Sequence, residues 1–307
     1  MATICITGGT GMVGKRLITH LTEAGFDVII LTRNPSLKSS TGKIRYAGWD
    51  PQNQTLDAAA IAESDYIIHL AGAGVAEKRW TEKRKQEIRD SRVNSGALLV
   101  KTLKETQHRV KAVISASAIG WYGPDNGIIF DENAPAAHDF LGDTCRQWEA
   151  SVDPLTAMGI RLVKLRIGIV LSTAGGALAE FMKPIRMGIA GVLGDGKQMI
   201  SWIHIDDLCR MFVYAIKQEQ MQGAYNAVAP KPVSNRTLTL QLARVMKGSF
   251  FIPMHVPAWV LRIVLGEMSV EVLKSCTASA EKIKNAGFVF QYPGIDAALQ
   301  ALVDKKK

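Results

Sequence analysis

Four glycines fall within residues 7–14, which read TGGTGMVG. Gly8, Gly11 and Gly14 are spaced G-x-x-G-x-x-G, and Gly9 adds an overlapping G-x-G-x-x-G. The segment follows a strand-like run and opens a helical pattern, which is the context in which such glycines bind a dinucleotide. Bare backbone lets phosphate oxygens approach exposed N–H groups at the positive end of a helix dipole. We therefore expect this turn to bind the pyrophosphate of a dinucleotide.

The end of the next apolar run bears on which dinucleotide it is. An NAD site usually places Asp or Glu about 20 residues after the glycines, where it bonds the ribose 2′-hydroxyl. This sequence has Thr32 and Arg33 at that place and no acid. A guanidinium can bind a 2′-phosphate through its planar fork of donors. Arg33 therefore favours NADP(H), and the alternative is a solvent-facing arginine without a ligand.

These residues need a scaffold, and the first 170 residues alternate between two patterns. Short β-branched runs, typical of strands buried on both faces, occupy 3–9, 27–33, 65–74, 111–120 and 160–171. Helical spacing marks 14–25, 81–106 and 145–159, the last with a break at Pro154. Strands separated by helices predict an α/β protein with a Rossmann-type, doubly wound parallel sheet.

The regular alternation of strand and helix patterns ends after about residue 172. Residues 172–198 are glycine-rich and irregular, and 201–218 return to a strand and a helix with Asp206 as the expected N-cap. The rest, from about residue 230, looks like a smaller mixed α/β region. We predict an NADP-binding domain at 1–171 and 202–225, and a smaller substrate-side region at 172–201 and 226–307.

Composition limits the class of protein. The 307 residues are 47% hydrophobic and 21% charged, as in soluble globular proteins. No apolar run approaches the roughly 18 residues of a membrane span, and the strand-like start leaves no room for a signal peptide. The four cysteines form no CxxC pair, which predicts reduced thiols, a cytoplasmic protein and no structural metal.

The formal net charge of +9 allows two kinds of anionic partner. A basic protein can bind nucleic acid, but it can equally hold a small anionic ligand. Part of the excess is the terminal KKK, expected to be a solvated tail, and the remaining positive charge is scattered. Without a nucleic-acid motif, we expect a small-molecule substrate and neither a nucleic-acid nor a membrane partner.

Longer motifs resemble a known superfamily. TGGTGMVG, HLAG, ISASAIGWYG, LRIGIVLS, SWIHIDDL and YNAVAP occur in the order of the extended short-chain dehydrogenases/reductases. GAGVAEKRWTEKRKQEIRDSRV, CRQWE and the stretch from PAWVLRIVLGEMSVEVLKS to GFVFQYPGIDAAL look like their atypical branch, the NAD-dependent epimerase/dehydratase-like proteins of the YfcH type. The resemblance covers almost the whole chain. It implies a Rossmann domain, a C-terminal substrate region and NADP, but no particular substrate.

The resemblance also implies positions for the cofactor. The pyrophosphate turn would comprise Gly8, Thr10, Gly11, Met12, Val13 and Gly14. Thr32 and Arg33 would hold the adenosine ribose and its 2′-phosphate, and Leu70, Ala71 and Gly72 would pass beside the adenosine side. Arg92 stands where the superfamily has an asparagine near the cofactor, and is either a further phosphate or ribose contact or a surface cation. Gly168 and Val170 would lie beside the nicotinamide.

The superfamily's catalytic set is incomplete in this chain. Ser117 matches its serine, but the expected tyrosine and lysine fall at Leu141 and Cys145, and no Y-x-x-x-K occurs anywhere. The lysine normally lowers the tyrosine pKa, so that the phenol exchanges a proton as hydride moves. Either another group such as Tyr122 takes the proton, or the reaction needs less proton chemistry, or the protein binds NADP without turnover. A tyrosine this close to the end of a strand can face the cleft, but it is more often a packing residue.

The leading hypothesis is an NADP-dependent epimerase or oxidoreductase acting on a small polar substrate, with a sugar nucleotide as one candidate. The alternative is a non-catalytic, NADP(H)-responsive regulator or scaffold. His204 looks catalytic in WIHIDD, but we expect a packed, hydrogen-bonded histidine there. Dimers through the two long helices near 82–105 and 140–158 are common in the superfamily, so a homodimer is a further candidate.

Overall fold

The computed structural model describes residues 2–37 and 40–304. Its centre is an eight-stranded sheet in the order β12-β7-β6-β5-β1-β2-β3-β4, in which all neighbours pair in parallel except the short β4. The strands are β1 (Thr3–Thr7), β2 (Asp27–Thr32), β3 (Ile44–Asp50), β4 (Thr55–Leu56), β5 (Tyr66–His69), β6 (Ala112–Ala118), β7 (Arg161–Ile167) and β12 (Gly223–Ala227). The predicted Rossmann-type sheet is confirmed.

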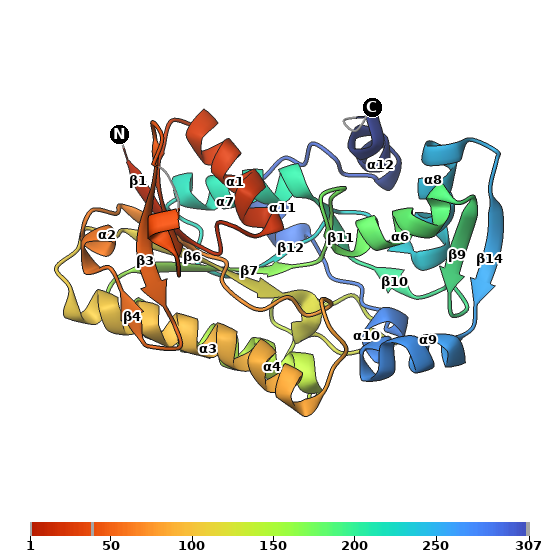
Figure 1. Cartoon of the computed structure of the whole chain (residues 1–307), viewed down its shortest axis with the longest axis horizontal. Helices are drawn as coiled ribbons and strands as arrows, with labels where there is room; N and C mark the ends of the chain where they lie inside the picture. The colour runs from red at the N-terminus through yellow and green to blue at the C-terminus, as the bar shows by residue number, and fades with distance from the viewer. Residues whose placement is uncertain (1, 38–39, 305–307) are drawn as a thin grey trace.

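Helices cover both faces of this sheet. In Figure 1, α1 (Met12–Glu23) and α7 (Ile205–Lys217) lie on one side, and α3 (Glu82–Glu105) and α4 (Phe140–Val152) on the other. Strand side chains alternate between the two cores: Ile4 and Ile6 face the α1–α7 side, whereas Cys5 joins the core that contains Leu99 of α3. Burial of both faces explains why the strands read as continuous apolar runs.

The helix predicted over 145–159 is interrupted where expected. It divides into α4 and α5 (Pro154–Ala157), with the proline at the start of the second piece. Sequence reasoning missed β3 and the short α2 (Ala58–Ala62), and it wrongly described 172–198 as irregular. That stretch forms α6 (Gly176–Arg186) and β9 (Ile189–Leu193), because its glycines avoid the interior of α6: Gly175 and Gly176 lie at the start of the helix, and the others follow it.

The predicted N-cap of α7 was wrong by two positions. His204 is the N-cap, and its Nδ1 accepts a hydrogen bond from the Asp206 backbone N–H at 3.0 Å. Asp206 instead lies in the first turn, where a carboxylate faces the positive end of the helix dipole. The expectation that His204 is a packed, hydrogen-bonded histidine is confirmed, since it is fully buried.

The remaining elements form smaller sheets and helices. The strands pair as β8 (Ile169–Leu171) with β11 (Trp202–His204), β10 (Met199–Ile200) with β13 (Val233–Ser234), and β9 with β14 (Ile252–Val256). The helices are α8 (Asn235–Lys247), α9 (Ala258–Leu265), α10 (Ser269–Leu273), α11 (Glu281–Asn285) and α12 (Ile295–Asp304), with single 3-10 turns η1 (Pro35–Leu37), η2 (Ile119–Trp121) and η3 (Gly266–Met268). Figure 1 places β9 and β14 at the opposite end of the molecule from β3.

The smaller elements are tied to the large sheet by a buried carboxylate. Asp125, in the loop after β6, accepts hydrogen bonds from the hydroxyls of Ser275 and Thr277 at 3.0 and 2.7 Å.

The boundaries predicted for the two regions stay a prediction, and the terminal KKK lies outside the described residues. All four cysteines are free and buried. Within the described chain, no helix is both long enough and apolar enough to cross a bilayer.

Candidate functional site

The glycine turn lies where β1 and β5 end side by side, at the point where the strand order reverses direction. Open α/β sheets bind their ligands at this crevice. Gly8 has a φ of +70°, and a Cβ on it would lie 2.9 Å from the Leu70 carbonyl. A Cβ on Gly14 would overlap the Gly8 carbonyl oxygen and lie 2.6 Å from Gly9 Cα. The turn is therefore bare backbone, packed so closely against the end of β5 and against itself that Gly8 and Gly14 leave no room for a side chain.

A threonine and a histidine fix the strand ends beneath this turn. Thr7 Oγ1 accepts hydrogen bonds from the backbone N–H groups of Leu70 and Ala71 at 3.0 and 3.1 Å. His69 places Nδ1 2.9 Å from the same oxygen and Nε2 3.3 Å from Ser95 Oγ. Burial lowers the pKa of His69 to about 4, so the imidazole stays neutral. These bonds hold the β5 end against the glycine turn.

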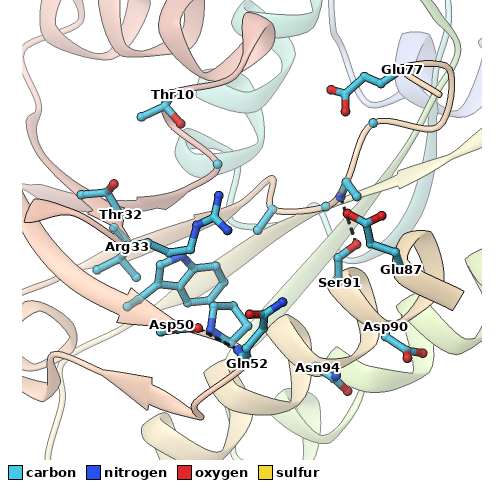
Figure 2. Close-up of a pocket in the computed structure, with 18 of the residues that line it drawn as sticks. Thr10, Thr32, Arg33, Asp50, Gln52, Glu77, Glu87, Asp90, Ser91 and Asn94 are labelled. Atoms are coloured by element: carbon cyan, nitrogen blue, oxygen red, sulfur yellow. Dashed lines mark hydrogen bonds between the residues drawn. The ribbon is translucent and has the colours of Figure 1, made fainter. Parts of the chain in front are cut away.

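A cavity of about 920 Å³ opens beside the turn, between β2–β3 and α3. Six residues predicted from the sequence line it: Gly8, Thr10, Thr32, Arg33, Ala71 and Gly72. Sequence reasoning missed its other walls, which include Trp49, Asp50, Gln52, Glu87, Ser91 and Asn94. Figure 2 shows Thr10, Thr32 and Arg33 on one side of the space and Glu87, Ser91 and Asn94 on the α3 side. The missed signals were the strand pattern IRYAGWD and the polar face of 81–106.

Arg33 is exposed at this cavity, and its charge acts on a carboxylate of the neighbouring strand β3. Asp50, at the end of β3, accepts hydrogen bonds from the backbone of Gln52 at 2.9 Å and Asn53 at 3.3 Å. These bonds and the nearby Arg33 guanidinium hold the Asp50 pKa below its usual range. Asp50 is therefore ionised beside Arg33. A phosphate bound at Arg33 has to share the guanidinium with this carboxylate.

Other predicted cofactor residues do not line this cavity. Met12 lies against Gly175 at the start of α6, Val13 packs on the core, and the Leu70 backbone supports Gly8. Gly168, at the β7–β8 junction, lies so close to Ser201 that a Cβ would sit 2.5 Å from its carbonyl oxygen. Val170 pairs with Ile203 in the β8–β11 sheet. Their roles toward a cofactor stay predictions.

Ser117 belongs to a buried polar cluster behind the strand ends. Its hydroxyl donates to Glu149 Oε1 at 2.7 Å. Arg166 donates to the same carboxylate twice, from Nε at 2.8 Å and from Nη2 at 3.2 Å. All three side chains are at most 4% exposed. Because the Ser117 proton points at Glu149, the hydroxyl meets any further group as an acceptor.

Tyr122 closes the other end of the same cluster. Its hydroxyl donates to Asn226 Oδ1 at 2.7 Å and accepts from Arg166 Nη1 at 3.1 Å. The side chain is fully buried, and this burial raises the pKa of the phenol to about 12. The acid–base role predicted for Tyr122 stays a prediction, and these surroundings speak against it, because a buried phenol with this pKa and with its oxygen bonded on both sides keeps its proton near neutral pH. Cys145 is equally inert, since burial raises its pKa to about 12.

Known proteins share this architecture and much of this sequence. Residues 4–150 match the NAD dependent epimerase/dehydratase family. Epimerase family protein SSP1921 of Staphylococcus saprophyticus is 36% identical over 301 residues, which cover 97% of this chain and 98% of the relative. The chain belongs to the epimerase/dehydratase family. Residues 256–302 match a further domain of unknown function, DUF1731.

Two solved structures extend the comparison within the epimerase/dehydratase family. The human epimerase family protein SDR39U1, crystallised with NADPH, is 26% identical, with a TM-score of 0.86 over 98% of this chain and 99% of its own. A nucleoside-diphosphate sugar epimerase from Corynebacterium glutamicum is 32% identical, with a TM-score of 0.77. This chain is covered to 98% in that pairing and the bacterial chain to 58%. The likeness extends over the whole fold, including the elements that surround the cavity.

Proposed function

We propose that this epimerase/dehydratase family member binds NADP(H) in the cavity beside the glycine turn. The observation that carries the choice of NADP(H) is Arg33, exposed at the cavity at the end of β2, where no carboxylate replaces it. The glycine turn fits a pyrophosphate, because Gly11 is the N-cap of α1 and no side chain caps the first N–H groups of that helix. The human relative crystallised with NADPH supports the same assignment.

The bound dinucleotide would accept and return a hydride, and this chain's residues would arrange the reactants. The glycine turn would hold the pyrophosphate, and Thr32 and Arg33 the adenosine ribose and its 2′-phosphate. Ser117 would orient a substrate hydroxyl by accepting its hydrogen bond, since its own proton is on Glu149. We propose a small polar substrate with a secondary alcohol or carbonyl. The sugar-nucleotide epimerase from C. glutamicum supports a sugar nucleotide.

Calorimetric titration with NADPH, NADP⁺, NADH and NAD⁺ tests the cofactor. Arg33→Ala removes a charged hydrogen-bond donor, which should cost roughly 1.5–3 kcal/mol of binding free energy, or about tenfold to a hundredfold in affinity. This loss is expected for NADPH and NADP⁺ and not for NADH and NAD⁺. Arg146→Ala is the matched control, because this exposed α4 arginine pairs with Asp143 outside the cavity. Equal affinity of the wild type for NAD(H) and NADP(H) would contradict the assignment.

A non-catalytic, NADP(H)-responsive regulator is the second proposal, and one observation favours it. Tyr122 is buried and bonded on both sides, and α4 carries Leu141 and Cys145 where the superfamily has its proton-exchanging pair. Stopped-flow fluorescence separates the two proposals, with NADPH-loaded protein mixed with small carbonyl compounds and NADP⁺-loaded protein mixed with sugar nucleotides as alcohols. Hydride transfer in either direction supports the enzyme, whereas tight cofactor binding without oxidation or reduction across the panel supports the regulator.

A further inference from the structure

Large apolar side chains lie exposed at the end of the molecule formed by β14 and α9. Phe250, just before β14, is 87% exposed, and Trp259 on α9 is 63% exposed. Five further exposed side chains accompany them, and together they form what we call the apolar end face: Met187, Ile252, Met254, Ile263 and Val264. Monomeric soluble proteins rarely expose large apolar patches, and such patches mark contact sites.

Backbone pairing brings these residues together. The Ile252 N–H donates to the Gly188 carbonyl oxygen at 2.8 Å, which places Ile252 next to the neighbourhood of Met187. Ile252 and Met254 lie two residues apart on β14 and therefore share one face of the β9–β14 sheet. Pro257 leads directly from β14 into α9. Figure 1 shows this connection at the end of the molecule away from β3.

The side chains of this end, rather than the free backbone edge of β14, are available for a contact. Because the Ile252 N–H bonds toward β9, the alternate residues Pro253 and His255 direct their backbone groups to the free edge. Pro253 has no N–H to donate, and a proline on an edge strand disfavours pairing with a further strand.

Positive charge surrounds the apolar end face. Residues 220–266 contain five Lys or Arg and no Asp or Glu. Four basic side chains lie in the last turns of the helices that end beside the face, namely Arg186 of α6, Arg244 and Lys247 of α8, and Arg262 of α9. Each helix C-terminus offsets only about half a charge, so a net positive charge remains.

This charge has no carboxylate partner. Among residues 2–37 and 40–304, none of the four basic side chains forms an ion pair, and the acids of α6 and η3 are already engaged in the pairs Glu180–Lys183 and Glu267–Lys85. Arg92 also lacks a carboxylate partner, but it is partly buried and its Nη1 donates to the carbonyl oxygens of Ala73 and Ile88. The four cations at the end face therefore differ in being unpaired beside an exposed apolar surface.

Charge decides between the partners that an apolar face with a positive rim allows. A second copy related by a two-fold axis would place the same cations opposite each other, which is unfavourable. A nucleic acid would attract the cations but leave the aliphatic side chains without a contact. An anionic bilayer surface satisfies both, because acidic headgroups attract Lys and Arg while aromatic and aliphatic side chains enter the headgroup boundary.

We propose that the apolar end face and its four basic neighbours bind the protein peripherally to an anionic lipid surface. The expectation of no membrane partner rested on the missing spanning segment, which a peripheral contact does not need. The proposal is independent of the cofactor. The cavity between β2–β3 and α3 lies toward the other end of the molecule, so it stays open to solvent when the end face is covered.

Sedimentation with sucrose-loaded vesicles tests this binding. Phosphatidylcholine vesicles with about 30% phosphatidylglycerol should pellet the protein, whereas phosphatidylcholine alone should not, because only the anionic headgroups attract the basic residues. Raising the salt from about 0.1 M to about 1 M should release most of the protein, since the Debye length falls from about 10 Å to about 3 Å. Equal binding to both kinds of vesicle, or binding to neither, would overturn the proposal.

A double variant tests the charges. Arg244→Gln with Lys247→Gln should weaken binding to the anionic vesicles about tenfold to thirtyfold, at about fivefold for each charge. The matched control is Lys101→Gln with Lys104→Gln, which removes two exposed lysines at the same spacing from α3. An equal loss in the control, or no loss in the first variant, would overturn the proposal.

The apolar part has its own variants. Trp259→Ser with Ile263→Ser should weaken binding at least tenfold, whereas Val289→Ser, which removes a 74% exposed side chain beside α7, should not. The other five tryptophans are buried or half-buried, so brominated lipids should quench mainly Trp259, and Trp259→Phe should bind but lose this quenching. Pelleting without quenching, a dimer that dissociates in the double variant, or an RNA oligonucleotide bound in place of vesicles would overturn the proposal.

Discussion

The Tyr122 hydroxyl donates a hydrogen bond to Asn226 Oδ1 at 2.7 Å, between residues 104 positions apart in the chain. The loop after β6 is thereby bound to β12, the edge strand of the large sheet. Asn226 continues the contact through its side-chain amide, which donates to the Ser279 carbonyl oxygen at 3.1 Å. One buried phenol thus connects the sheet to the C-terminal part of the chain, which is a structural role.

Tyr122→Phe should therefore lower stability and leave cofactor affinity unchanged. The variant removes one donor and one acceptor from a fully buried site, which should cost about 1–3 kcal/mol of unfolding free energy. Urea unfolding measures this loss and calorimetry the affinity, with the half-buried Tyr46→Phe as control. A variant that stayed as stable as the wild type but lost turnover would restore the acid–base role of Tyr122.

Glu149→Gln should destabilise the protein more strongly. Arg166 is 4% exposed, and removal of the carboxylate charge leaves its guanidinium buried without compensation. Breaking a buried ion pair in this way typically costs about 3–5 kcal/mol. The control is Glu180→Gln, whose exposed pair with Lys183 should contribute less than about 1 kcal/mol. Chemical denaturation of both variants tests this, and similar losses would show that the Glu149 pair is no more than a surface pair.

His69 should make stability depend on acid pH. Its pKa is about 4 in the folded protein and 6.5 in an unfolded chain, so the unfolded state binds more protons between these values. The contribution is complete above about pH 6.5 and falls by up to about 3 kcal/mol as the pH drops toward 4. His69→Gln should flatten this part of the stability profile relative to the exposed His138→Gln. Parallel profiles for the two variants would contradict the prediction.

Gly14→Ala should abolish dinucleotide binding. The added methyl group would overlap the Gly8 carbonyl oxygen and approach Gly9 Cα to 2.6 Å, so the turn has to open. Overpacking of this kind usually costs about 1–3 kcal/mol. Thermal unfolding and NADPH fluorescence measure the two effects. Gly294→Ala is the control, because nothing lies within 4 Å of its added methyl group. NADPH binding at wild-type strength in Gly14→Ala would place the ligand elsewhere.

The first half of the fold was predictable, because the hydrophobic periodicity of each segment agrees with its burial in the folded sheet. The strand before Gly8 and the helix after it follow from periodicity, and the two-sided burial of Ile4, Cys5 and Ile6 matches their continuous apolar pattern. The smaller sheets were not predictable, since strands of two or three residues such as Val233–Ser234 carry no measurable periodicity. Their pairings are decided by tertiary packing.

The candidate site was predictable only where backbone determines it. Gly8 and Gly14 are visible in the sequence as glycines. The structure requires glycine at both positions, because the positive φ of Gly8 and the close backbone contacts of Gly14 exclude side chains. The burial of Tyr122 could not be predicted from the sequence, because it depends on Asn226 and Arg166, which come from distant strands. Asp50 was missed because it approaches Arg33 only through the pairing of β3 with β2. The homodimer through α3 and α4 stays a prediction.

The position of β12 restricts how this chain can be recombined with its relatives. The strand reaches the sheet edge only after the chain has left the large sheet for residues 168–222, and it pairs with β7 over Gly223–Ala227. Arg161 of β7 also donates to the carbonyl oxygens of Ala215 and Met221. A chimera cut once near residue 171 would separate these partners. A graft therefore has to keep 202–227 together with the first half of the chain.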